Sequence, residues 1–346
     1  MKNATRVLAA LAVACLITAP AMGVGYYELV PWSTVQAGGT GTSHWTHVID
    51  GQTSYHTVNL NSAPHISKVV NLNGAQSSSV LVTAAAWAAA SGQTSMANAH
   101  GFGISNGTDL MWTDTGSDGV WKASLSDGSI TAYVTKAQVQ AHTGLTNAAS
   151  LSPNEIDQNG EMVWYEGESD SILVTTGLGT LTTLVSAAAL TAAQGNSSVS
   201  GGMTYDGNGN LYWGNATTDN IFARAGDGTL YEVLSTAEIS AVTGAATAGF
   251  GDLLAAPDGL IYFYESTADH IMRFDPADAA NTLMIYVSEA ELNAGPMAGD
   301  NVQSFGWYDG NLTWTTFGSK GLYVVPEPAT LALLGLGGLA LIRRRR

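Results

Sequence analysis

Cysteine and basic residues are the scarcest features of this sequence. Its 346 residues include one cysteine, Cys15, which excludes a disulfide framework and any cysteine-ligated zinc or iron–sulfur site. Lysine and arginine number 12 against 28 acidic residues, so the formal net charge is −16. Phosphate binding needs a basic surface, and the sequence therefore indicates no nucleic-acid partner. Charged residues make up 12% of the chain and hydrophobic residues 45%, enough for a sizeable core.

Residues 1–21 have the pattern of a secretory signal peptide. Lys2 and Arg6 precede an apolar run from Val7 to Ile17, and the small residues Ala19-Pro20-Ala21 follow it. This order predicts secretion and cleavage after Ala21. The alternative is an uncleaved membrane anchor, although the apolar run is short for a span.

The C-terminus, residues 326–346, has three parts in a fixed order. Pro326-Glu327-Pro328 is followed by a 14-residue apolar stretch, Ala329 to Ile342, and then by four arginines, Arg343 to Arg346. A durable transmembrane helix needs roughly 20 residues. Because arginine clusters stay in the cytoplasm, we expect this tail to hold the chain in the inner membrane only transiently.

This tail resembles the PEP-CTERM sorting signal of Gram-negative bacteria, with Pro326, Glu327 and Pro328 as the sorting motif. The resemblance implies an exosortase-type sorting enzyme as a partner, with cleavage near the motif. It also implies delivery to the cell surface or to the exopolysaccharide matrix. The alternative is a tail-anchored membrane protein.

Removing both terminal segments changes the charge balance. Six basic residues remain against 28 acidic ones between Glu28 and Glu327, so the mature chain carries a charge of −22. Such a surface favours solubility and repels other polyanions.

A repeat of about 50 residues fills the region between the two signals. Five aromatic residues, each with an apolar residue eight positions later, mark five copies: Trp112, Trp164, Trp213, Phe263 and Trp314. A weaker copy centres on Val58 and Ile66, which makes six units. We interpret the aromatic residues as packing between the units rather than as a sugar-stacking ring.

Each unit is expected to be a four-stranded meander, because short alternating runs are separated by Asp-Gly and Asn-Gly turns. A Ser/Thr cap, an alanine-rich body and a closing glycine then predict a two-turn helix between units, as in Ser235 to Gly244. Its expected buried residue is Trp87, Val139, Leu190, Ile239 or Leu292.

Six such units predict an all-β, six-bladed β-propeller over residues 22–325. The sixth unit lacks a fourth strand, and Tyr27-Glu28-Leu29-Val30 matches the missing piece, with Ser33 to Gly38 in the place of the helix. The N-terminal strand is therefore expected to close the last blade, leaving no open sheet edge. The blade motif, clearest in Met111-Trp112-Thr113-Asp114, resembles YWTD and NHL-type six-bladed propellers, which implies this fold and a bias towards binding.

Four aspartates occupy one repeat position before the third strand of their units. They are Asp118, Asp170, Asp219 and Asp269. In a propeller these loops share the helix-bearing face, so the aspartates are candidate ligands for a cation such as Ca²⁺. The alternative is that each side chain bonds the backbone of its own loop.

Three further groups contain residue types that occur in functional sites. Asp206-Gly207-Asn208-Gly209-Asn210 has calcium-loop spacing but lacks the closing carboxylate, so we interpret it as a turn. His44, His47, His56 and His65 fall in the first unit, yet a zinc site needs three to converge, and His44 and His47 are expected on opposite strand faces. Glu155, Asp157 and Asp252 are the non-repeated acids at the inner strands.

The sequence therefore predicts a secreted, surface- or matrix-sorted binding or structural propeller without catalysis. The expected partner beyond the sorting enzyme is an extracellular polysaccharide or a surface protein. The alternative is a metal-dependent hydrolase of the lactonase or gluconolactonase type, which would need acids such as Glu155, Asp157 and Asp252 to meet at the central channel.

Overall fold

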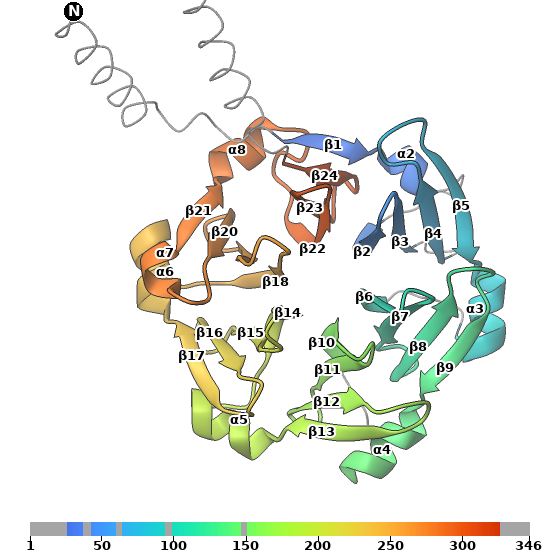
Figure 1. Cartoon of the computed structure of the whole chain (residues 1–346), viewed down its shortest axis with the longest axis horizontal. Coiled ribbons are helices and arrows are strands. Elements are labelled where there is room, and N and C mark those ends of the chain that lie inside the picture. The colour runs from blue at the N-terminus through green and yellow to red at the C-terminus, as the bar shows by residue number, and fades with distance from the viewer. Residues whose placement is uncertain (1–25, 37–42, 60–63, 94–98, 147–150, 326–346) are drawn as a thin grey trace, which may run out of the picture.

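The computed structural model describes residues 26–36, 43–59, 64–93, 99–146 and 151–325, and these form a ring of six four-stranded antiparallel sheets (Figure 1). The first three blades comprise β2 (Ser43–Asp50), β3 (Thr53–Asn59), β4 (His65–Val70) and β5 (Ser77–Val82); β6 (Ala99–Ser105), β7 (Asp109–Asp114), β8 (Gly119–Ser124) and β9 (Ile130–Val134); and β10 (Leu151–Ile156), β11 (Met162–Glu166), β12 (Ser171–Thr175) and β13 (Leu181–Val185). The prediction of a six-bladed all-β propeller is confirmed.

The last three blades repeat the same order from the inner strand to the outer one. They comprise β14 (Ser200–Tyr205), β15 (Leu211–Asn215), β16 (Asn220–Arg224) and β17 (Leu230–Leu234); β18 (Phe250–Ala255), β19 (Ile261–Glu265), β20 (His270–Phe274) and β21 (Met284–Val287); and β22 (Val302–Tyr308), β23 (Asn311–Thr316), β24 (Leu322–Val324) and β1 (Tyr27–Val30). The inner strands of neighbouring blades contact one another around the ring axis.

The N-terminal strand closes blade 6, as predicted. β1 pairs antiparallel with β24, with Tyr27 opposite Val324 and Glu28 opposite Tyr323. Tyr26, just before β1, packs its ring 5.1 Å from that of Trp314 and donates a hydrogen bond of 2.7 Å to the Leu292 carbonyl. Closure therefore combines strand pairing with an aromatic anchor.

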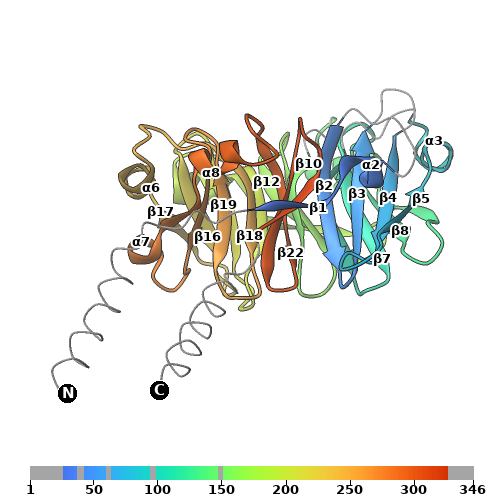
Figure 2. The same cartoon turned by 90° about the horizontal axis from the view of Figure 1, so that it is seen from above.

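Short helices connect the blades on one side of the ring (Figure 2). They are α3 (Ala84–Ser91), α4 (Lys136–Thr143), α5 (Ala187–Gln194), α6 (Thr236–Thr243) and α8 (Glu289–Ala294), with a single turn, α2 (Trp32–Val35), after β1. In α6 the Ser235 hydroxyl accepts the Glu238 amide, and Gly244 ends the helix at φ 76°. The five predicted helix residues from Trp87 to Leu292 are all buried. A further turn, α7 (Ala279–Thr282) between β20 and β21, was not predicted.

The first blade departs from the predicted register. In the other blades the residue after the aromatic pairs with the apolar residue seven positions on, as Thr113 pairs with Val120. In blade 1 the partner of Ile66 is Thr57, which places His56 rather than Val58 at the aromatic position. The sequence assignment was therefore wrong by two residues, because two more residues lie between Thr57 and Ile66 than between Thr113 and Val120.

Among the residues that the structure describes, no helix is long and apolar enough to cross a membrane. The predicted signal peptide, with cleavage after Ala21, lies outside the described residues. So does the predicted tail from Pro326 to Arg346.

Candidate functional site

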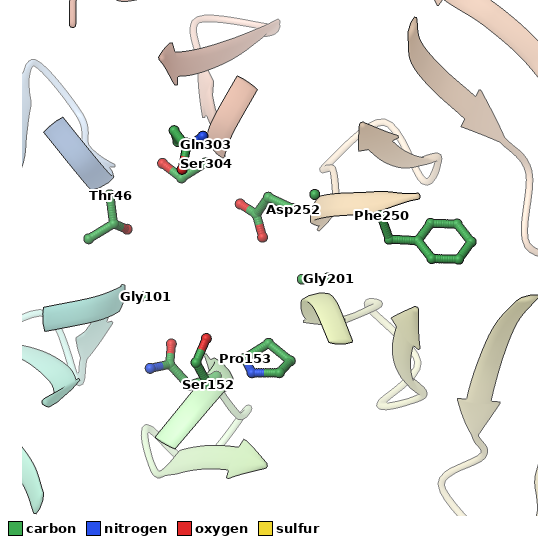
Figure 3. A pocket seen from close by; sticks show the side chains of 12 residues that line it. Thr46, Gly101, Ser152, Pro153, Gly201, Phe250, Asp252, Gln303 and Ser304 are labelled. Atoms are coloured by element: carbon green, nitrogen blue, oxygen red, sulfur yellow. The ribbon is translucent and has the colours of Figure 1, made fainter. Parts of the chain in front are cut away.

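The six inner strands enclose a channel along the ring axis. One cavity of about 220 Å³ is lined by residues at the beginning of these strands, and a second of about 460 Å³ continues along their length. Because each inner strand follows a helix-bearing connection, the smaller cavity is the helix-side mouth of the channel. Figure 3 shows the Asp252 carboxylate pointing into this mouth, with Thr46, Ser152 and Ser304 around it.

Glu155 on β10 and Asp252 on β18 are the two acids that the fold brings together at the channel. The pKa of Glu155 is raised to about 8, mainly by burial and in addition by the nearby charge of Asp252, although hydrogen bonds from the Ile156 amide and the Thr204 hydroxyl act in the opposite direction. Burial likewise raises the pKa of Asp252 to about 7, although the amides of Phe305 and Leu253 donate to it and lower the value. Near neutral pH this pair can therefore both hold and accept protons.

Asp157, the third acid singled out from the sequence, has a different role. Its Oδ1 accepts the backbone amides of Asn159 at 2.8 Å and Glu161 at 2.9 Å. The side chain therefore stabilises the turn between β10 and β11 while lying at the wall of the larger cavity. Of the three predicted channel acids, two meet and the third caps a turn.

Asp252 also belongs to a set of inter-blade contacts that the sequence analysis missed. Its Oδ2 accepts the amide of Phe305 in the next blade at 2.7 Å. Ser304, at the same repeat position, accepts the amide of His47 at 3.2 Å, and Thr46 accepts that of Phe102 at 3.3 Å. The three residues share one position in the repeat. Each directly precedes the inner-strand residue that pairs with the repeated aromatic residue of its blade, or with His56 in blade 1.

Three blades have no polar side chain at that position, where Gly101, Pro153 and Gly202 stand instead. Two residues beyond Gly202, the Thr204 hydroxyl accepts the amide of Ala255 in blade 5 at 2.9 Å and also donates to Glu155. The channel wall is therefore held together by side-chain oxygens that accept backbone amides across blade boundaries. Asp252 contributes both to this wall and to the chemistry of the mouth.

The four predicted cation ligands lie in four different blades, each at the same point of its turn. Asp118, Asp170, Asp219 and Asp269 all have left-handed backbones, with φ between 51° and 56°. Lys320 stands at the equivalent position of blade 6 and has φ 67°, so the common feature is the backbone conformation rather than the charge. Aspartate is among the few side chains that adopt this conformation readily.

Three of these aspartates have a side-chain partner in their own blade or in the helix that follows it. Asp118 forms a salt bridge of 2.7 Å with Lys136, Asp170 accepts the hydroxyl of Tyr165 at 2.7 Å, and Asp269 accepts that of Tyr264 at 2.6 Å. Within the described part of the chain, no three histidine, cysteine or acidic side chains lie together in a group suited to a metal ion. Calcium binding by the four aspartates stays a prediction.

Other acids of the same loops cap the backbone. At the ends of their second strands, Asp114, Glu166 and Glu265 are fully buried. Glu265 accepts the amides of Thr267 and Ala268, and Asp114 and Glu166 accept equivalent amides of their own loops. These side chains therefore order the loops that surround the helix-side face.

The described histidines of blade 1 belong to no group suited to a metal ion. His47 and His56 are buried with stacked rings 6.1 Å apart, and His47 contacts the hydroxyls of Ser304 and Thr313 in blade 6. His65 contacts the Gln36 carbonyl at 3.2 Å. The side chain of His44 lies outside the described residues. His47 and His56 therefore occupy the places of the aromatic pair that Phe102 and Trp112 form in blade 2.

The Asp206 loop is an ordinary turn between β14 and β15. Asp206 Oδ1 accepts the amides of Asn208 at 2.8 Å and Asn210 at 2.9 Å, and Gly209 has φ 80°. The repeated aromatic residues Trp112, Trp164, Trp213, Phe263 and Trp314 are almost completely buried. Asp206 is therefore engaged by its own turn, and the aromatic residues belong to the core.

Comparison with known families identifies the C-terminus. Residues 324–346 match the PEP-CTERM protein-sorting motif. The motif indicates an extracellular protein that is sorted at the membrane of a Gram-negative bacterium and processed by an exosortase. No curated protein matches the chain.

Solved structures similar to this chain are propellers with low sequence identity. Virginiamycin B lyase from Staphylococcus aureus is 14% identical with a TM-score of 0.55, and the alignment covers 83% of this chain and 81% of the lyase chain. A gluconolactonase from Xanthomonas campestris is 11% identical with a TM-score of 0.55, covering 87% and 88%. A calcium-binding protein, regucalcin, from Agrobacterium tumefaciens is 11% identical with a TM-score of 0.52, covering 83% and 92%. Likeness at this level shows the fold alone.

Proposed function

We propose that the mature chain is a binding protein of the cell surface or exopolysaccharide matrix, and that it binds a neutral saccharide segment at the helix-side mouth of its channel. The observation that carries the proposal is the composition of that mouth. Hydroxyls, amides and one carboxylate converge there from several blades, from residues such as Ser152, Asn154, Asp252 and Gln303. Such groups match the hydroxyls of a sugar.

Charge supports a neutral ligand over an anionic one. No lysine or arginine lines either cavity of the described channel. The mature chain also carries a charge of −22, which repels polyanions. A neutral segment needs no basic partner in the channel and is not repelled by the negative chain, and it can still form hydrogen bonds to the mouth.

The test is calorimetry with size-fractionated oligosaccharides from the purified exopolysaccharide. We expect binding by the mature protein, and a loss of affinity in Gln303→Ala and in Asp252→Ser. The second variant retains a hydroxyl acceptor like that of Ser304 at the inter-blade contact. Asp227→Asn, in the exposed turn between β16 and β17, is the matched control. Equal affinities in all four proteins would exclude the channel mouth as the site.

The carboxyl pair supports a hydrolase as the second candidate. Lactonase-type propellers use acids from different blades at the channel, and Glu155 and Asp252 come from blades 3 and 5 with pKa values raised to about 8 and about 7. One protonated and one ionised carboxyl are suited to general acid–base catalysis. The assay is hydrolysis of small lactones with calcium or with a chelator. Turnover that Glu155→Gln abolishes would favour this candidate over binding alone.

A further inference from the structure

Both processing sites of the precursor flank a single blade. The predicted signal cleavage after Ala21 is followed by four residues and then Tyr26, where the described chain begins. The sorting motif begins at Pro326, directly after Val325, the last described residue. Since Tyr27 pairs with Val324, the end of β24 that leads into the motif lies beside the start of β1.

The residues before the motif are part of the folded core. Tyr323, Val324 and Val325 are each no more than 2% exposed. The Val325 amide donates to the Leu312 carbonyl at 3.2 Å, and β24 is covered by β23 on one edge and by β1 on the other. Proteases cut backbone that is exposed and free of such bonds. These residues are therefore unavailable to a protease while blade 6 is closed.

We propose that the sorting enzyme acts on the closed propeller, and that blade 6 confines its cleavage to the chain after Val325. Closure by β1 then precedes cleavage in the order of maturation. This inference rests on the sorting motif and on blade 6, and is independent of any ligand in the channel.

The length of the connection adds a positional consequence. Three residues, Pro326-Glu327-Pro328, separate Val325 from the apolar stretch that begins at Ala329. Even fully extended, this connection spans no more than about 15 Å. While the tail is in the membrane, blade 6 is therefore held close to the membrane surface, within reach of a membrane-embedded enzyme.

The experiment locks the closed state with a disulfide. Directly opposed residues of an antiparallel pair lie about 4.5–5.5 Å apart, which suits a disulfide, so Tyr27→Cys with Val324→Cys should cross-link β1 to β24. Cys15 leaves with the signal peptide, and no other cysteine competes in the oxidising compartment. The full precursor is expressed in a host with its exosortase, and intact mass gives the C-terminus and the disulfide. The single variant Tyr27→Cys is the matched control.

Only the disulfide-bonded fraction is scored, because the bond itself reports that the blade is closed. We expect this fraction to be processed to the same extent as the control, with a C-terminus at or after Pro326. A locked protein that retains Arg343 to Arg346 while the control is cut would overturn the proposal, since the enzyme would then need an open blade. A C-terminus between Leu322 and Val325 in the locked protein would overturn it as well.

Discussion

A left-handed backbone limits what each of the four repeated aspartates can be replaced by. Asp219, at φ 56°, is the most informative one because its φ is the largest of the four. Glycine and asparagine accept this conformation, whereas a β-branched side chain clashes with the backbone. We expect Asp219→Asn and Asp219→Gly to unfold at nearly the same denaturant concentration as the wild type.

The contrasting variant is Asp219→Val, which should lose about 1–2 kcal/mol of unfolding free energy. Thr182→Val, at an exposed position of strand β13, is the control for introducing valine and should change stability little. Urea unfolding measures all four variants. If Asp219→Val proved as stable as Asp219→Gly, the turn conformation would not explain the repeat of aspartate.

The channel carboxyls predict how stability depends on pH. The pKa of Glu155 is raised from 4.5 to about 8 and that of Asp252 from 3.8 to about 7, so the folded state holds protons that the unfolded state releases. The contribution of these two acids to stability is therefore largest below their unfolded pKa values and is lost as the pH rises from about 4 towards about 8. Ionisation of both acids in the folded protein should cost several kcal/mol.

Glu155→Gln removes one of these titrations and should flatten the fall in unfolding free energy between pH 5 and pH 8. Glu232→Gln, on the outer strand, serves as the control and should follow the wild-type curve. Urea unfolding at several pH values gives the comparison. Parallel curves for the wild type and Glu155→Gln would show that Glu155 does not titrate in this range.

Strand β1 is the element on which closure of the ring depends. Deleting Tyr26 to Val30 removes the pairing with β24 and the burial of Val30, which is fully buried. We expect a loss of several kcal/mol and a lower melting temperature. An unchanged midpoint would mean that blade 6 obtains its fourth strand elsewhere.

A milder change separates the anchor from the strand. Tyr26→Phe keeps the ring contacts with Trp314 and Tyr323 but removes the bonds to the Leu292 carbonyl and the Met297 amide. This substitution should lower the unfolding free energy by about 1–2 kcal/mol, the usual contribution of two such hydrogen bonds.

The elements that the sequence predicted well are those with a repeated physical signal. Turn residues, helix caps and the buried aromatic positions recur about every 50 residues, and β1 was recognised by its match to an outer strand. Blade 1 was misaligned because His56 replaces the aromatic residue and the following loop is longer. The turn α7 was missed because it occurs in a single blade.

The channel was harder to predict because its residues are distant in sequence. Glu155 and Asp252 were noted as unusual acids, but their approach depends on how two non-adjacent blades tilt around the axis. The inter-blade contacts of Thr46 and Ser304 were missed, since a small polar residue on a strand carries no sign of a partner some 50 or 250 residues away. Tertiary arrangement, rather than local pattern, creates this site.

The charge of the whole molecule gives the last prediction, which concerns calcium. With both predicted terminal signals removed, the chain would carry a charge of −22 and repel itself, and a bound divalent cation would relieve that repulsion. If the four repeated aspartates bind calcium, millimolar calcium should raise the melting temperature and release heat in calorimetry. Replacing Asp118, Asp170, Asp219 and Asp269 together by Asn should abolish both effects. The fold should survive, because asparagine tolerates the left-handed turn.

A second quadruple variant separates specific binding from general screening of charge. Replacing four exposed aspartates elsewhere in the propeller, Asp50, Asp127, Asp227 and Asp278, by Asn changes the net charge by the same amount. This control should keep the full response to calcium if the repeated aspartates are the ligands. Equal responses in the two variants would mean that calcium acts only through the overall charge. If the wild type gives no heat of binding at millimolar calcium, the prediction is wrong. The partners of the four aspartates among the described residues would then be their own turns, two tyrosine hydroxyls and Lys136.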